Sequence, residues 1–204
     1  MSERTIAVIS AGIGQPSSTR LLADQLAAAT RADLEHRGVA ARPHPVDLRD
    51  HAHDLVNNLL TGFPPAALQP TADAVRGAAG LIAVTPVFNA SYSGLFKLFF
   101  DVLDDAALVD KPVLIAATGG TARHSLALEH ALRPLFAHLR AVVVPTSVFA
   151  APEDWAGATA TGPLNARIGR AGRELADQIA RREPAAPADP FALTTSFEEL
   201  LAGE

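Results

Sequence analysis

Cysteine is absent from this sequence of 204 residues. The chain therefore has no disulfide, no thiolate zinc site, no cysteine-held iron–sulfur cluster and no cysteine nucleophile. Phosphatases of the low-molecular-weight class, which need a cysteine in their phosphate loop, are excluded for the same reason. Hydrophobic residues make up 49% of the chain and charged residues 19%, so enough apolar material is present for a folded core.

Long apolar segments and an excess of basic residues are also lacking. No apolar run approaches the roughly 18 residues that span a bilayer, and the residues before Thr5 do not form the pattern of a signal peptide. The formal net charge is -5, which argues against a protein that coats nucleic acid or an anionic membrane. We expect a cytoplasmic protein with neither nucleic acid nor membrane as a partner.

Short β-branched apolar runs alternate along the chain with segments of helical periodicity. Strands are expected at residues 5–10, 39–46, 80–85, 112–117 and 141–145, and helices at about 18–38, 47–60, 71–79, 94–103, 124–139 and 161–182. This alternation predicts a three-layer α/β fold with a doubly wound, five-stranded parallel sheet. Two prolines, Pro43 and Pro45, indicate that the second strand lies near a sheet edge. One domain is expected over residues 1–184, with a C-terminal arm or tail over residues 185–204.

Ligands of such sheets bind beyond the carboxyl ends of the strands, which directs attention to three loops. The first, residues 10–20, combines small residues such as Gly12 with three consecutive hydroxyl side chains, Ser17, Ser18 and Thr19. A helix that begins there points free N–H groups and its positive dipole end at an anion. The loop is neither a Walker loop nor a dinucleotide fingerprint. A phosphate monoester is the natural ligand, and a plain hydroxyl-rich helix cap is the alternative.

The second and third loops follow the most strand-like segment and the strand after it. Residues 85–97 bring an aromatic, an amide and several hydroxyl groups together, a mixture suited to a flat polar ring such as a flavin. Residues 117–121 contain Gly119 and Gly120, where the backbone can approach a ligand closely. Each loop also has a simpler interpretation. The aromatics of the second loop could merely cover the end of the sheet, and the third loop could be an ordinary strand-to-helix turn.

The three loops together resemble the NAD(P)H-dependent FMN reductases of flavodoxin-like fold, particularly those that supply reduced flavin to two-component monooxygenases. The most specific stretch, residues 117–135, is similar to the pattern T-G-G-x-x-x-H-x-L-A-L-[DE]-[YH]-x-L-R-P-x-[LF] of that family. Residues 86–97 are similar to its P-x-[YF]-x-x-x-x-[ST]-G-x-x-K signature. The resemblance extends from about residue 4 to residue 150.

The resemblance implies a set of cofactor-binding residues. Ser17, Ser18 and Thr19, helped by Ser10, Gly12 and Arg20, would hold the FMN phosphate. Pro86, Val87, Phe88, Asn89, Tyr92 and Ser93 would line the ribityl chain and the ring, while Thr118, Gly119 and Gly120 would contact its pyrimidine edge. His124 either contacts the flavin or caps a helix. Arg20 and Arg123 are two candidates for the additional phosphate of NADPH, with a plain surface role as the alternative for each.

By resemblance the protein passes a hydride from NADPH or NADH to flavin N5, a step that needs no catalytic side chain. It would form a homodimer or homotetramer and would supply reduced flavin to a partner monooxygenase. A quinone, azo or metal-ion reductase with bound FMN is the nearest alternative, and a flavodoxin-type electron carrier is a second. A receiver-like module is excluded because residues 10–19 contain no acidic cluster. Among the histidines and aspartates of residues 47–54, a solvated polar face is a better interpretation than a metal site.

Overall fold

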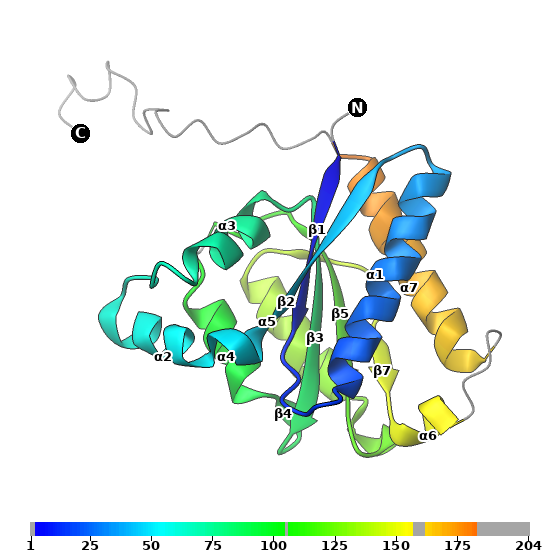
Figure 1. Cartoon of the computed structure of the whole chain (residues 1–204). Coiled ribbons are helices and arrows are strands. Elements are labelled where there is room, and N and C mark those ends of the chain that lie inside the picture. Colours follow the sequence, from blue (N-terminus) through cyan, green and yellow to red (C-terminus); the bar gives the residue numbers. More distant parts are fainter. Residues whose placement is uncertain (1–2, 105, 157–161, 183–204) are drawn as a thin grey trace.

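The parallel sheet predicted from the sequence is present. A computed structural model of the chain describes residues 3–104, 106–156 and 162–182. The sheet has the order β2-β1-β3-β5-β6 with parallel neighbours, which confirms the doubly wound arrangement (Figure 1). The strands are β1 (Arg4–Ser10), β2 (Ala41–Asp47), β3 (Gly80–Phe88), β5 (Pro112–Thr118) and β6 (Val142–Val143). β2 lies at the edge, as its prolines predict, and the order reverses between β1 and β3.

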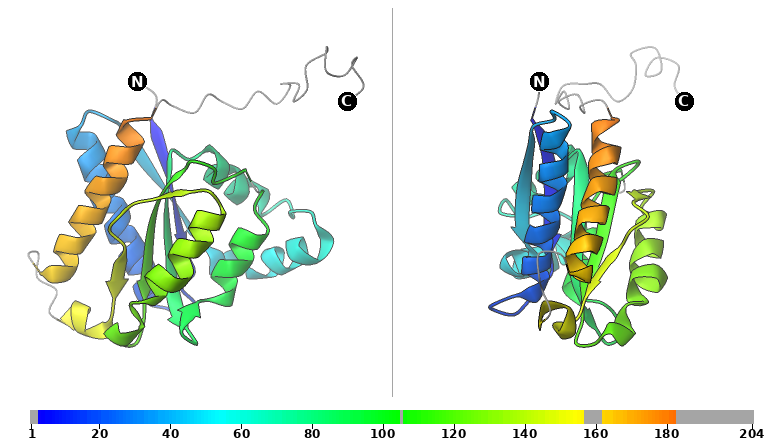
Figure 2. Two further views of the ribbon diagram at one scale, coloured as in Figure 1. Left: turned by 180° about the vertical axis from the view of Figure 1, so that it is seen from behind. Right: turned by 90° about the vertical axis from the view of Figure 1, so that its right-hand side faces the viewer.

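Helices cover both faces of the sheet, so the fold has the three layers that the sequence predicts (Figure 2). One face packs against α1 (Ser18–His36) and α7 (Pro163–Ala180). The other packs against α2 (Ala52–Thr61), α3 (Gln69–Gly77), α4 (Gly94–Asp101) and α5 (Arg133–His138). A 3₁₀ helix at Leu48–His51 precedes α2, and the short α6 (Pro152–Ala156) follows the sheet. The predicted tail, residues 185–204, lies outside the described residues.

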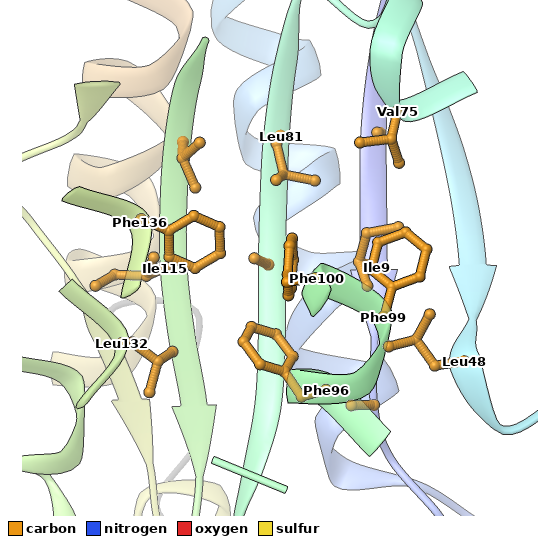
Figure 3. Close-up of a cluster of buried hydrophobic side chains, with 14 of the residues drawn as sticks. Ile9, Leu48, Val75, Leu81, Phe96, Phe99, Phe100, Ile115, Leu132 and Phe136 are labelled. Atoms are coloured by element: carbon orange, nitrogen blue, oxygen red, sulfur yellow. The ribbon is translucent and has the colours of Figure 1, made fainter. Parts of the chain in front are cut away.

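Successive side chains of the central strands are buried in opposite layers. On β1, Ile6 and Val8 pack toward α1 and α7, while Ala7 and Ile9 pack toward the opposite helices. The aromatic centre of that second layer is formed by Phe96, Phe99, Phe100 and Phe136 (Figure 3). The ring centroid of Phe100 lies 4.8 Å from that of Phe96 and 5.0 Å from that of Phe136. Burial on both faces explains why these strands are nearly continuous apolar runs.

Residues 86–93, predicted to be a loop, form a hairpin instead. β3 continues to Phe88, and β4 (Ser91–Tyr92) pairs antiparallel with it, with Val87 opposite Tyr92. The turn consists of Asn89 and Ala90, whose φ angles are 48° and 70°. Two consecutive positive φ angles characterise the tight turns that join hairpin strands, and glycine is their usual sequence signal. No glycine occupies either position, so the sequence carried little indication of the hairpin.

The helix predicted at residues 124–139 is divided into three parts. A 3₁₀ helix at Ala122–His124 comes first, a π-helix occupies Leu128–Leu132, and α5 begins at Arg133. Pro134, near the start of α5, has no N–H to donate, and its ring would meet the carbonyl of the residue four positions earlier in a regular α-helix. The wider π turn in front of it avoids that conflict.

The predicted fifth strand is shorter than expected and is continued by a second one. β6 pairs with the start of β5, and β7 (Val148–Ala150) pairs with its end. Pro145 lies between the two strands and cannot donate to a ladder. Nearer the C-terminus, the helix predicted over residues 161–182 is α7, which begins at Pro163 after the N-cap residue Gly162 and ends at Ala180. Residues 157–161 lie outside the described part.

Lys111 is a buried cation at the amino end of β5. Its Nζ donates to the carbonyls of Val75, Arg76 and Ala78 at 2.6, 2.8 and 2.9 Å, which joins the end of α3 to the start of β5. Burial, with a smaller contribution from the charge of Arg76, lowers the pKa of Lys111 to about 8. The charged ammonium is therefore held at a cost, since most lysines lie in water.

Candidate functional site

The three loops singled out in the sequence meet at the carboxyl ends of β1, β3 and β5. They enclose a cleft of about 320 Å³ beside the point where the strand order reverses. Its lining residues are Ile13, Gly14, Pro16, Ser17, Ser18, Thr19, Pro86, Val87, Phe88, Thr118, Gly119, Gly120 and Pro152. None of these residues has a charged side chain, so the groups that the cleft offers to an anion are N–H groups, hydroxyls and a helix dipole.

The floor of the cleft is the N-terminus of α1. Ser17 is the N-cap residue, and its Oγ accepts a hydrogen bond from the N–H of Arg20 at 3.1 Å. The N–H groups of Ser18 and Thr19, at the first two helical positions, have no acceptor within the helix. They lie at the positive end of a helix of 19 residues, where an anion is stabilised.

A hydrogen bond joins the first loop to the third across the cleft. The hydroxyl oxygens of Thr19 and Thr118 are 2.8 Å apart, and both side chains are buried. In the third loop the N–H of Gly119 donates to the carbonyl of Ala150 at 3.2 Å. The N–H of Gly120 has no such partner among the described residues and is the one free to face a ligand.

Two glycines are required where the loops approach other atoms closely. A Cβ on Gly12 would lie 2.1 Å from the Oγ of Ser17, and a Cβ on Gly119 would lie 2.8 Å from the Cζ of Phe149. Both distances are far below an ordinary contact. Ser10, at the end of β1, has a buried Oγ without a hydrogen-bond partner in the described part of the chain. A phosphate-bearing flat ligand fits this cradle of bare backbone, hydroxyls and one helix terminus.

The hairpin supplies the apolar wall of the cleft. Pro86, Val87 and Phe88 line it, and Phe88 is 46% exposed. Asn89 lies in the turn beyond the lining residues. Tyr92 instead packs against Phe96, with ring centroids 6.0 Å apart, and lines a separate hollow between α4 and α5.

Four other predicted residues lie elsewhere. The Oγ of Ser93 accepts the N–H of Phe96 and thereby caps α4. Gly12 and Arg20 line a smaller neighbouring hollow, which shares Gly14 and Ser17 with the cleft. His124 lies in the 3₁₀ helix after the third loop and lines a further hollow.

The guanidinium of Arg20, predicted to help hold a phosphate, is occupied by two carboxylates. Its Nε donates to Asp24 at 2.8 Å and its Nη1 donates to Asp47 at 2.5 Å. The hydrogen bond to Asp24 and the charge of Asp47 raise the pKa of Arg20. The pairing ties α1 to the end of β2, and it neutralises the charge that the sequence interpretation had assigned to the ligand.

Sequence reasoning missed several residues of the site. Gly14 and Pro16 lie within the first loop and were within reach of the same argument, whereas Pro152 belongs to α6 and had no local signal. Arg49 was also missed. Its Nη1 donates to the carbonyl of Ile13 at 3.1 Å, and with the Gln15 amide oxygen turned toward it, its Nη2 donates to that oxygen at 2.9 Å. Arg49 thus braces the first loop from the neighbouring 3₁₀ helix.

Within residues 3–104, 106–156 and 162–182, no helix is long and apolar enough to cross a bilayer. The same residues contain no group of three or more histidine, aspartate or glutamate side chains placed to hold a metal ion. His51, from the polar cluster noted in the sequence, has its Nε2 3.4 Å from the hydroxyl of Thr71.

A family model and two curated relatives agree on the class of protein that this chain resembles. Residues 4–156 match the family model described as NADPH-dependent FMN reductase. The NADH-dependent FMN reductase SfnF of Pseudomonas fluorescens is 40% identical over 164 residues, covering 80% of this chain and 85% of that protein. The FMN reductase (NADPH) of Pseudomonas aeruginosa is 39% identical over 164 residues, covering 80% and 86%.

Solved structures agree with these relatives. An oxidoreductase from Corynebacterium diphtheriae superposes with a TM-score of 0.84 at 47% identity, covering 89% of this chain and 99% of that one. A flavodoxin, WrbA-like protein from Agrobacterium tumefaciens has a TM-score of 0.57 at 16% identity, covering 90% and 100%, and shares the fold alone. The flavodoxin-like fold expected from the sequence is therefore confirmed.

Proposed function

The chain belongs to the family of NADPH-dependent FMN reductases, and from that premise we propose that the cleft at the N-terminus of α1 is its flavin site. Family membership confirms the enzyme class and the pairing of FMN with a reduced nicotinamide nucleotide that the sequence predicted. It also sets aside the electron-carrier alternative. The assignment of individual binding residues remains a proposal.

One observation carries the proposal: an uncharged cleft ends on a capped helix N-terminus with three hydroxyl side chains. In it, Ser17, Ser18 and Thr19 hold the FMN phosphate, with the free N–H groups of the first turn as further donors. No lysine or arginine lines this cleft, so the helix terminus supplies the electrostatic attraction. Arg20 acts indirectly by fixing α1 against Asp47.

The other two loops hold the ring system. Pro86, Val87 and Phe88 provide apolar contact along one wall, while Thr118 and Gly120 offer a hydroxyl and a free N–H at its edge. FMN held there would supply the redox chemistry, the acceptance of a hydride from the reduced nicotinamide. The chain orients the ring and donates N–H groups toward the edge where negative charge develops. No titratable side chain lines the cleft, which agrees with a step that needs no acid or base.

Three finer expectations stay predictions. Reduced flavin is passed to a partner monooxygenase, the protein assembles as a homodimer or homotetramer, and it is located in the cytoplasm. A quinone, azo or metal-ion reductase would use the same cleft and differ only in its final acceptor, so an acceptor assay is needed to separate the two.

Comparison of FMN with riboflavin tests the proposal, because riboflavin has the same ring and lacks the phosphate. We expect the purified protein to bind FMN at least about tenfold more tightly than riboflavin, and to oxidise NADPH or NADH in the presence of FMN. Equal affinity for the two flavins would remove α1 from the site. Absence of FMN-dependent nucleotide oxidation would refute the activity, and faster turnover with quinone or azo acceptors would favour the alternative reductase.

A further inference from the structure

A second hollow, of about 330 Å³, lies beside the cleft and is formed by the continuation of the same two segments. Its lining residues are Ala90, Arg123, His124, Leu126, Ala127, His130 and Ala131. On the hairpin, Phe88 lines the cleft and Ala90 lines this hollow. After β5, Gly120 lines the cleft and Arg123, three residues later, lines this hollow. The hollow and the cleft are therefore connected through two chain segments, the hairpin and the loop after β5.

We infer that this hollow receives the adenosine end of the nicotinamide nucleotide and that Arg123 selects NADPH over NADH by binding its 2′-phosphate. The inference rests on the proposed flavin site, because the nicotinamide must stack on the ring in the cleft. Relatives of nearly equal similarity are named for NADH in one case and NADPH in the other, so family membership leaves the choice between the two nucleotides open.

The charge distribution separates Arg123 from the other arginines near the site. Arg20 is paired with Asp24 and Asp47, Arg133 is paired with Glu129, and Arg49 donates to the first loop. The guanidinium of Arg123 has no partner among the described residues. No carboxylate lines the hollow. Glu153 approaches this segment, but it accepts the N–H of Ala122 and is not a lining residue.

The rest of the hollow suits an adenosine phosphate. Leu126 is 62% exposed and, with Ala127, presents apolar surface of the kind on which an adenine ring packs. His124 and His130 add two imidazole groups beside the arginine. An unpaired guanidinium binds a phosphate dianion through two parallel hydrogen bonds. The 2′-hydroxyl of NADH carries no charge and cannot accept two such bonds side by side. This is the single chemical difference between the two nucleotides.

The experiment measures kcat/KM for NADPH and NADH with the wild type, Arg123→Ala and Arg123→Lys at saturating FMN. We expect the wild type to prefer NADPH, and Arg123→Ala to lower kcat/KM for NADPH by about ten- to a hundredfold through KM. The value for NADH should stay within about threefold, and Arg123→Lys should retain part of the preference. Arg31→Ala is the matched control, since Arg31 is an exposed arginine of α1 that is paired with Glu35.

A binding measurement makes the result independent of turnover. By calorimetry, 2′,5′-ADP should bind the wild type more tightly than 5′-AMP, and Arg123→Ala should abolish the difference. Equal binding of the two, a wild type that prefers NADH, or an equal loss for both nucleotides in Arg123→Ala would overturn the inference. Failure of FMN to bind would instead refute the proposed function, and the FMN titration is therefore performed on every variant.

Discussion

The substitution Gly12→Ala adds a single methyl group to the first loop of the proposed flavin site. The added methyl carbon would lie 2.1 Å from the Oγ of Ser17 and 3.1 Å from the Cβ of Thr19. Carbon and oxygen atoms in contact are normally well over 3 Å apart, so a side chain must move. The Ser17 hydroxyl is the group that can rotate away, and doing so breaks its hydrogen bond to the N–H of Arg20.

Two magnitudes follow from that movement. Loss of the N-cap hydrogen bond costs about 1 kcal/mol of folding free energy. A bound phosphate loses the Ser17 hydroxyl and meets a displaced loop, and one hydrogen bond to a charged group contributes about 1.5–3 kcal/mol. FMN affinity should therefore fall by roughly ten- to a hundredfold, while the protein stays folded.

The assay combines an FMN titration, followed by flavin fluorescence, with urea denaturation of the FMN-free protein. Gly77→Ala is the control, because outside its chain neighbours and its own helix backbone no described atom lies within 4 Å of the position of its added Cβ. Ser17→Gly provides the sharper comparison, since it removes the obstructing side chain and glycine is itself an acceptable N-cap. Gly12→Ala should be costly in the wild type and clearly less costly in the Ser17→Gly background, where the 3.1 Å approach to the Cβ of Thr19 is the close contact that remains.

Equal effects of Gly12→Ala in the two backgrounds would refute this reasoning, because the clash with Ser17 would then not be the cause. Unchanged FMN affinity in Gly12→Ala would be equally damaging. It would mean that the first loop does not hold the phosphate.

Three further substitutions test other parts of the structure. Ser18→Asp should lower FMN affinity at least about tenfold, because the new carboxylate repels the phosphate. The melting temperature of the FMN-free protein should stay the same or rise slightly, because an acidic residue is favourable at a helix N-terminus. Ser18→Asn is the neutral control, and an unchanged Kd of Ser18→Asp for FMN would contradict the proposed site. Arg49→Ala should weaken FMN binding several-fold, since it frees the loop at Ile13, and Arg49→Lys should do so less; equal Kd values in both variants and the wild type would show that the brace is unimportant. Lys111 has a pKa of 10.5 in the unfolded chain and of about 8 in the folded chain. The unfolded chain therefore binds more protons between these two pH values, and the free energy of unfolding rises with pH across that window. Urea denaturation should show the wild type gaining up to about 3 kcal/mol relative to Lys111→Met over that window, and a constant difference would be inconsistent with the lowered pKa.

Local sequence patterns were sufficient for much of the architecture. The strand that ends at Ser10 and the hydroxyl cap at Ser17 are encoded by neighbouring residues, because strand burial and helix capping depend on the nearest few positions. The order of the loops along the chain then indicated the site, since parallel strands deliver their following loops to one edge of the sheet. By contrast, the turn at Asn89 and Ala90 lacks glycine, and the π-helix before Pro134 has no simple sequence signal.

Only the tertiary structure decided which charged side chains can face a ligand. From its position in the first loop, Arg20 was expected to face a phosphate, but the fold brings Asp47, 27 residues away, against it. Pro152 and Arg49 reach the site from distant elements for the same reason: a long-range contact is set by how layers pack and not by adjacent residues. The sequence by itself determined the fold class, the family and the three loops that form the cleft. The tertiary structure decided which cations remain free to meet a ligand, because that depends on the carboxylates and carbonyls that folding places beside each one.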